Sequence, residues 1–259
     1  NGDTYTLNAN KGVVLATGGF GSNIEMRKKY NPEMDEKYNS TDSVADTGDG
    51  IVMAEEIGAE LRDMSYIQTC DVVSGALLYV DDARLYGFSI LVNAEGKRFV
   101  NELGRRDVLS KVILSQTGGV CYEVMDQSAF EEAKIMENHG GEVAYLTANN
   151  GLVKADTLEE AAKLMGVDPA QLVETVKQYN SYVDAQHDAE FERKAMNKKI
   201  ENGPFYLVKA TPAVHHTMGG VAINTEAQVL RPDGTVIPNL YAADEVTGDI
   251  HGTNRLGSC

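Results

Sequence analysis

The last twenty residues constrain this chain more than any other stretch. An apolar strand is expected at residues 240–243, and it leads into a loop at residues 244–259 that is rich in small residues and carries one arginine, Arg255. Glycine has no Cβ, so such a backbone lets a large planar ligand approach closely. A guanidinium offers a planar fork that suits a carboxylate, and Glu245 can accept hydrogen bonds from ligand hydroxyls. A mobile surface turn would explain the glycines alone, but the strand, Glu245 and Arg255 together favour a ligand-binding loop.

A second cluster, at residues 212–221, contains the adjacent residues His215 and His216, followed by two glycines. Adjacent side chains of an extended segment point to opposite faces, so the two imidazoles are not suited to one metal ion. One interpretation puts one histidine on the surface and the other in the core. The other interpretation lets one imidazole donate a hydrogen bond to a substrate carboxylate or carbonyl, while Gly219 and Gly220 leave room for a flat cofactor.

Two further segments combine a regular element with glycines. Residues 13–21 read as a buried strand that ends in a glycine turn, a weak signal by itself because many α/β folds contain one. Residues 47–50 open an amphipathic helix with Ile51, Ala54, Ile57 and Leu61 on one face, and Asp49 is expected to cap it.

In this order, the clusters resemble the flavoprotein family of fumarate reductases and their soluble relatives, such as urocanate reductases. The matching stretches span nearly the whole chain, and they are Ala16–Phe20, Thr47–Gly50, Val92–Glu102, Arg106–Asp107, His215–Gly220, Glu245–Gly248 and Asn254–Gly257.

The resemblance implies an FAD-dependent reduction of the C=C bond of an α,β-unsaturated carboxylate, such as fumarate, urocanate or a related acid. Flavin N5 supplies the hydride, because no amino-acid side chain can. The family's proton donor is an arginine, and alignment on the Arg-Asp pair makes it Arg106, with Asp81 and Arg84 as its proton relay. By the same resemblance, the substrate ligands are His216, Arg255 and Ser258. The expected FAD contacts are Ala16, Thr17, Gly18, Asp49 and Glu245.

Other interpretations of these residues remain open. Arginine is ordinarily a poor acid, and Arg106 could instead form a surface ion pair with Asp107. Asp81, Asp82 and Arg84 could lie in a solvated loop. A flavin-dependent ketosteroid dehydrogenase has a related fold but needs no carboxylate ligands, and a folded, inactive module without FAD is the non-enzymatic alternative.

One departure from the family concerns the substrate. Fumarate reductases carry a His-Pro-Thr stretch that binds the second carboxylate, whereas this chain has Cys70 at the position of the histidine. A thiol is a weak hydrogen-bond donor. The departure favours an unsaturated monocarboxylate over fumarate.

The expected fold class is α+β, with a substrate-capping domain at residues 66–214 inserted between two pieces of an incomplete α/β FAD-binding domain at residues 1–65 and 215–259. The insertion is implied by the resemblance. Sequence patterns predict strands at residues 4–7, 12–16, 77–80, 88–92 and 120–125, and helices at 108–114, 128–137, 157–165 and 168–185. A turn at residues 93–97 should precede residues 98–100, and residues 231–234 should form a hairpin turn.

Composition excludes several classes of partner. The net charge of −16 argues against nucleic acid and against anionic membrane surfaces. No apolar run reaches the ~18 residues of a membrane span. Cys70, Cys121 and Cys259 are odd in number and widely spaced, so neither a disulfide framework nor a zinc site is indicated, and we expect buried thiols.

No Gly-x-Gly-x-x-Gly follows a strand, and by the resemblance this motif lies upstream in a longer flavoenzyme, so the chain looks like a central piece of one. The electron donor, a heme or FMN domain or another protein, is left open, as is the cellular location.

Overall fold

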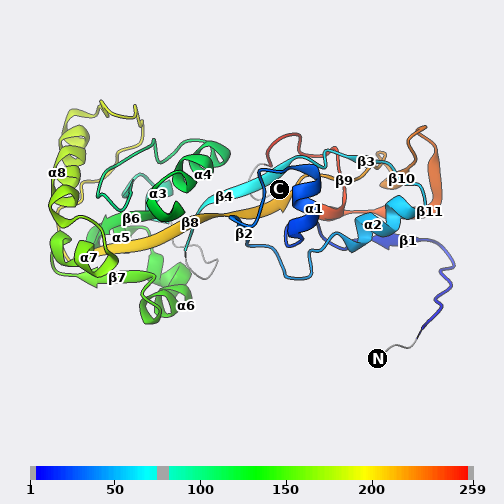
Figure 1. Cartoon of the computed structure of the whole chain (residues 1–259), viewed down its shortest axis with the longest axis horizontal. Coiled ribbons are helices and arrows are strands. Elements are labelled where there is room, and N and C mark those ends of the chain that lie inside the picture. The colour runs from blue at the N-terminus through cyan, green and yellow to red at the C-terminus, as the bar shows by residue number, and fades with distance from the viewer. Residues whose placement is uncertain (1–3, 75–81, 256–259) are drawn as a thin grey trace. The chain divides into compact units, whose positions relative to one another are not determined.

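The computed structural model describes residues 4–74 and 82–255. Contacts divide the chain into two compact units (Figure 1). One consists of two segments, Asn1–Gln68 and Val214–Cys259, and we call it the split unit. The other is continuous, Thr69–Ala213, and we call it the central unit. The expected α+β class agrees with this mixture of helices and several sheets, while the roles of the units as FAD-binding and capping domains stay predictions.

The split unit contains a three-stranded sheet in the order β1 (Val13–Leu15), β11 (Val236–Ala242) and β10 (Gln228–Leu230). β1 is parallel to β11, and Val13 lies opposite Leu240. β10 and β11 are antiparallel and joined by the predicted hairpin turn, in which the Gly234 amide donates to the Arg231 carbonyl. A second pair is β3 (Leu61–Arg62) with β9 (Gly220–Val221). The strand predicted at residues 4–7 is absent, and those residues belong to no regular element.

Two helices and one short 3₁₀ turn complete the described split unit: α1 (Ile24–Tyr30), α2 (Asp49–Glu56) and η2 (Asp244–Val246). In α2, Ile51 and Ala54 are buried as predicted, but Ile57 lies beyond the helix and is 53% exposed. The expected cap at Asp49 is wrong. Asp49 is the first helical residue, and the N-cap is Gly48, with φ of 81°, a conformation that glycine tolerates best.

The central unit is built on a sheet whose longest strand is β8 (Phe205–Thr217). The order β8, β6 (Cys121–Asp126), β5 (Ile90–Val92) is antiparallel, and β7 (Leu152–Ala155) and β4 (Ile67–Ser74) also pair with β8. β8 and β4 each continue along the chain from one unit into the other. β2 (Asn39–Ser40) also pairs with β8, and next to it the Thr41 amide donates to the carbonyl of Val214, a residue of the same split unit.

Helices surround this sheet: α3 (Asp82–Leu85), α4 (Arg106–Leu114), α5 (Gln127–Glu132), α6 (Ile135–Ala148), α7 (Leu158–Met165) and α8 (Pro169–Ala185), with η1 (Thr117–Gly119) after α4. α7 and α8 lie together at one side of the sheet (Figure 1) and share a core with β5 and β6. Members of that core include Ile90, Val124, Ala162, Leu172 and Leu207.

The predicted elements of the central unit are confirmed in most cases. Thr157 caps α7 and Asp168 caps α8, and each side chain accepts a hydrogen bond from the backbone amide three residues later. β6 and α4 occupy the predicted stretches, and β5 is shorter than predicted. The turn at residues 93–97 is present, and Arg98 after it forms a single bridge with Val92.

The predicted helix at residues 128–137 is two helices, because Lys134 adopts φ of 53° between α5 and α6. The strand predicted at residues 77–80 lies outside the described residues.

Candidate functional site

The glycine turn after β1 is packed against two other segments of the split unit. A Cβ on Gly19 would lie closer than 3.0 Å to the side chains of Thr217 and Glu245, so the position admits only glycine without rearrangement. Glu245 Oε1 accepts from the Thr217 amide at 2.7 Å and from Thr217 Oγ1 at 3.0 Å. The end of β8, the glycine turn and η2 therefore meet at one place, as the order of the sequence clusters implied.

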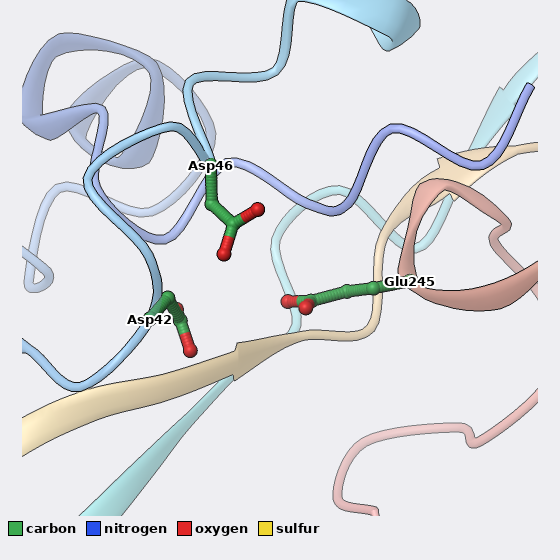
Figure 2. A group of neighbouring side chains, drawn as sticks. All are labelled: Asp42, Asp46 and Glu245. Carbon is green, nitrogen blue, oxygen red and sulfur yellow. The ribbon is translucent and has the colours of Figure 1, made fainter.

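Three carboxylates lie close together where the end of β8, the glycine turn and η2 meet, and they belong to Asp42, Asp46 and Glu245 (Figure 2). Their nearest oxygens all lie within 4.8 Å of one another. Burial raises the pKa of Glu245 to about 7, the hydrogen bonds from Thr217 oppose the shift, and the charge of Asp42 adds to it. Burial also raises the pKa of Asp42. Near neutral pH, Glu245 can thus accept or donate a hydrogen bond. Three carboxylates alone do not define a metal centre, and we assign none.

The two histidines of β8 have different partners, as predicted for an extended segment. His215 Nδ1 lies 2.7 Å from Thr41 Oγ1. His216 Nδ1 lies 3.6 Å from Glu245 Oε1, and its ring meets the His251 ring edge-on at 5.5 Å between centroids. Burial lowers the pKa of His216 to about 4, with help from the positive charge of Arg255 and from His251 and His215. His216 is therefore a neutral imidazole at pH 7.

His216 lines a cavity of about 390 Å³ that belongs wholly to the split unit. Its other walls come from β11, η2 and the loop after them, and include Ala243, Glu245 and His251. Sequence reasoning gave His251 no role. The only signal was its position in the small-residue loop, four residues before Arg255.

Arg255 is half-buried, and its Nε is buried without a hydrogen-bond partner in the part of the chain that the structure describes. Its backbone is fixed from the other segment of the split unit. Gln68 Nε2 donates to the Arg255 carbonyl and to Asn254 Oδ1, both at 2.7 Å. A guanidinium with a buried and unused Nε–H is suited to an anionic ligand. Ser258, the third expected substrate ligand, lies outside the described residues.

Of the remaining expected FAD contacts, Ala16, Thr17 and Asp49 are solvent-exposed in the split unit and Gly18 is half-buried. Ala16 and Thr17 follow β1, and Asp49 begins α2. A Cβ on Gly50 would overlap the Thr17 side chain, so the turn after β1 lies directly against the start of α2. The structure thus brings Thr17 and the first turn of α2 together.

Arg106 begins α4 in the central unit, and its side chain is 35% exposed. The alternative ion pair with Asp107 is wrong, because Asp107 is bound by Arg105 through two contacts of 3.0 Å. Arg106 Nε instead lies 3.8 Å from Oδ1 of Asp71, a buried carboxylate of β4 that sequence reasoning missed.

The alternative of a solvated loop is also wrong for Arg84. Arg84 is buried and lies 3.2 Å from Asp71 Oδ2. Asp82 is likewise not free in solvent, since His139 Nε2 lies 2.6 Å from its carboxylate. His139 is therefore half-buried and paired. Asp81, the other expected relay residue, lies outside the described residues.

Cys70 and Cys121 are both buried, as expected. Cys70 packs against Ala213.

Features of the split unit fit part of a flavin cofactor. Glu245 can bind a hydroxyl, and the buried Arg255 Nε, which has no hydrogen-bond partner in the described chain, needs an acceptor. The glycines of the turn after β1 make room for protein side chains, since a Cβ on Gly18 or Gly19 would overlap Asp46, Thr217 or Glu245. No helix among residues 4–74 and 82–255 is long and apolar enough to cross a membrane.

Comparison with known proteins agrees with this fit. The family model described as "FAD binding domain" matches residues 1–259. The chain is 50% identical to urocanate reductase of Eggerthella lenta over 261 residues, and the match covers 100% of this chain and 43% of the relative. It is 45% identical to NADH:acrylate oxidoreductase of Vibrio harveyi, over 99% of this chain and 26% of that relative.

Among solved structures, the open conformation of a flavocytochrome c3 fumarate reductase superimposes with a TM-score of 0.81 and 41% identity, covering 95% of this chain and 43% of that one. The fold and the site residues thus define a flavoprotein module. The chain belongs to the FAD binding domain family, and FAD is the cofactor that this membership supports. The chain spans less than half the length of these curated relatives.

Proposed function

We propose that this chain provides the substrate-reducing part of an FAD-dependent oxidoreductase that reduces the C=C bond of an α,β-unsaturated carboxylate. The observation that carries the proposal is the buried Arg255 Nε that lacks a partner in the described chain, beside a histidine whose pKa keeps it neutral. Together they offer a charged and a neutral donor to one carboxylate. The relatives named for urocanate and acrylate reduction support the same substrate class.

The chemistry divides between cofactor and chain. When bound, FAD supplies a hydride to one alkene carbon. His216, Arg255 and Ser258 bind the substrate carboxylate, and Arg106 delivers a proton to the other alkene carbon. Arg84 belongs to the relay that returns a proton to Arg106, together with Asp81.

In this proposal the split unit is part of the FAD-binding domain and the central unit is the substrate-capping domain. Ala16, Thr17, Gly18, Asp49 and Glu245 contact FAD. Electrons reach the flavin from a heme or FMN domain or from a separate protein. Heme is supported by the relative that is a flavocytochrome c3.

A ketosteroid dehydrogenase is the weaker alternative, because a steroid needs neither Arg255 nor Arg106 as a carboxylate ligand or proton donor. An inactive module remains the second alternative for the 259 residues by themselves, since they contain no Gly-x-Gly-x-x-Gly loop for the pyrophosphate of FAD.

The proposal is tested by replacing Arg106 in the FAD-loaded enzyme. Arg106→Ala should lower turnover of the unsaturated acid by at least ~10²-fold, the lower range for loss of a general acid, while an artificial donor still reduces the flavin. Arg106→Lys should restore little, because an ammonium cannot reproduce the planar fork.

Arg105→Ala is the matched control, since the neighbouring Arg105 is two-thirds exposed and occupied with Asp107. Near-normal turnover of Arg106→Ala, with loss in the control, would move the acid to Arg105. Normal turnover in both would reject this mechanism.

A further inference from the structure

Asp71 places one oxygen toward each of two arginines in the central unit. Its side chain is only 1% exposed. Oδ2 lies 3.2 Å from Arg84 Nη1, and Oδ1 lies 3.8 Å from Arg106 Nε. A buried carboxylate is costly unless it is paired, so this arrangement stabilises a charge that the core would otherwise exclude.

The two arginines are held differently. Arg84 is 4% exposed in its side chain, and its Nη1 also donates to the Glu102 carbonyl at 2.6 Å. Arg106 is about one-third exposed and has the longer contact. Arg84 and Asp71 therefore form the fixed, buried pair, and Arg106 is the outer cation, free to present its other N–H groups to a ligand.

The strand that carries Asp71 also holds the backbone of Arg106. Thr69 lies two residues earlier on β4, and alternate residues of a strand share a face. Thr69 Oγ1 and Ser110 Oγ are 2.7 Å apart, and Ser110 Oγ donates to the Arg106 carbonyl at 2.6 Å. One face of β4 thus fixes the first turn of α4 through its backbone and the Arg106 guanidinium through Asp71.

This arrangement suits an arginine that gives up a proton. In the part of the chain that the structure describes, Asp71 faces both Arg84 and Arg106. After Arg106 loses a proton, the Asp71 carboxylate is still paired with Arg84 at the shorter distance, so it keeps a cationic partner.

We propose that Asp71 is a positioning residue that holds Arg106 in the orientation needed for proton delivery and keeps Arg84 beside it. The inference rests on the proposed function, because it assumes that Arg106 is the proton donor. It extends that function to a residue on β4 to which neither the resemblance nor local sequence pointed.

The test is Asp71→Asn, which keeps the shape and removes the charge. In the FAD-loaded enzyme, kcat for the unsaturated acid should fall about tenfold or more, a part of the ~10²–10⁴-fold that a general acid provides. KM should change less than threefold, because the carboxylate ligands are elsewhere. Asp71→Glu keeps the charge and should retain more of kcat than Asp71→Asn.

Asp188→Asn is the matched control. Asp188 is another buried carboxylate of the central unit, and it pairs with Arg98 at 2.7 Å. Its loss should lower thermal stability to a similar extent as the loss of Asp71, yet leave kcat of the folded enzyme within twofold. An equal loss of kcat in both variants would mean a purely structural role and would overturn the proposal.

A second readout needs neither substrate nor flavin. Phenylglyoxal modifies accessible guanidinium groups, and peptide mass spectrometry can follow Arg106 and Arg105 separately in the 259-residue chain. Asp71→Asn should accelerate modification of Arg106 severalfold relative to Arg105, whereas Asp188→Asn and Asp71→Glu should not.

An unchanged Arg106 rate in Asp71→Asn would overturn the positioning role, even if the enzyme reduces unsaturated acids. If the loaded enzyme reduces no such acid, the proposed function fails instead, and the modification rates still decide whether Asp71 holds Arg106.

Discussion

Glu245 and His216 are close enough to form an ion pair, at 3.6 Å between Oε1 and Nδ1, yet burial pushes both toward their neutral forms. The pKa of Glu245 is raised to about 7, and that of His216 is lowered to about 4. At neutral pH the imidazole carries no charge, so the distance alone overstates their attraction. The desolvation of the two groups therefore outweighs their mutual attraction.

Glu245→Gln removes the cost of burying a charged carboxylate and should therefore increase stability in a pH-dependent way. Because its folded-state pKa lies above the ordinary 4.5, Glu245 keeps its proton in the folded state between about pH 4.5 and 7. Its contribution to stability is therefore lost as the pH rises through this window. Above pH 7 the glutamine variant should be more stable than the wild type, by up to about 3 kcal/mol. Its amide oxygen can still accept from Thr217.

Urea denaturation of the 259-residue chain at pH 5 and pH 8 measures the effect. The difference between variant and wild type should shrink toward zero at the lower pH. His216 acts with the opposite sign, adding stability as the pH rises from about 4 to 6.5, but it is present in both proteins. Glu159→Gln, at an exposed position of α7, should give the same difference at both pH values. A glutamine variant that gains nothing at pH 8 would contradict the raised pKa.

Among single residues, sequence reasoning could identify types and motifs but not long-range partners. Arg84 and Arg106 were singled out by resemblance, and the structure brings both to Asp71. Asp71 itself follows Cys70 in an ordinary strand, and no local pattern marks a carboxylate that will be buried beneath two distant arginines.

At the scale of elements, the two glycines after β8 are needed for a different physical reason from the predicted one. Gly219 and Gly220 were expected to leave room for a flat cofactor. In the structure, a Cβ on Gly219 would lie closer than 3.0 Å to backbone atoms of Asp63 and Met64, and one on Gly220 would meet the backbone of Val246 and Thr247. These glycines make room for the protein's own chain where β9 meets its neighbours.

Gly219→Ala should therefore destabilise the split unit, because backbone atoms cannot move aside as a flexible side chain can. We expect a loss of roughly 1–3 kcal/mol, typical of overpacking. Gly141→Ala is the matched control: the position lies in α6 with no atom within 4 Å of the added Cβ, and it should gain up to about 1 kcal/mol from helix propensity. Thermal unfolding should show a lower stability than wild type for Gly219→Ala and a slightly higher one for Gly141→Ala. A Gly219→Ala variant as stable as the wild type would show that this backbone packing is not tight.

Elements with strong local signals were predicted well. Thr157 and Asp168 each provide a capping oxygen, and Pro169 fits the first helical position, so α7 and α8 begin where expected. The break between α5 and α6 was not predicted. It depends on a positive φ at Lys134, and a lysine in the sequence gives no sign of this conformation.

At the scale of the whole molecule, the order of motifs carried most of the functional inference, and composition contributed only exclusions. Periodicity could not have shown that Asn1–Gln68 and Val214–Cys259 form one compact unit. That arrangement depends on pairings such as β1 with β11, whose residues are more than two hundred positions apart. Contacts of such long range leave no local pattern in a single sequence.

The substrate range is a property of the whole enzyme and provides the last prediction. By the resemblance, Cys70 is expected to stand where fumarate reductases carry a histidine, and its thiol is buried against Ala213. The nearby Gln68 already uses its amide N–H groups on Asn254 and Arg255. A second substrate carboxylate without a donor would cost roughly 1–3 kcal/mol. An unsaturated monocarboxylate should therefore exceed fumarate in kcat/KM by on the order of tenfold or more.

Steady-state assays of the FAD-loaded enzyme with urocanate, acrylate, cinnamate and fumarate measure this ratio. Cys70→Ala serves as the control and should leave the ratio unchanged, because a thiol that donates to no substrate group can be removed without changing the preference. Cys70→His is less informative, since a buried position against Ala213 has no space for an imidazole and the variant should lose stability. Faster reduction of fumarate than of every monocarboxylate would show that another residue binds the second carboxylate, and the preference inferred from Cys70 would be wrong.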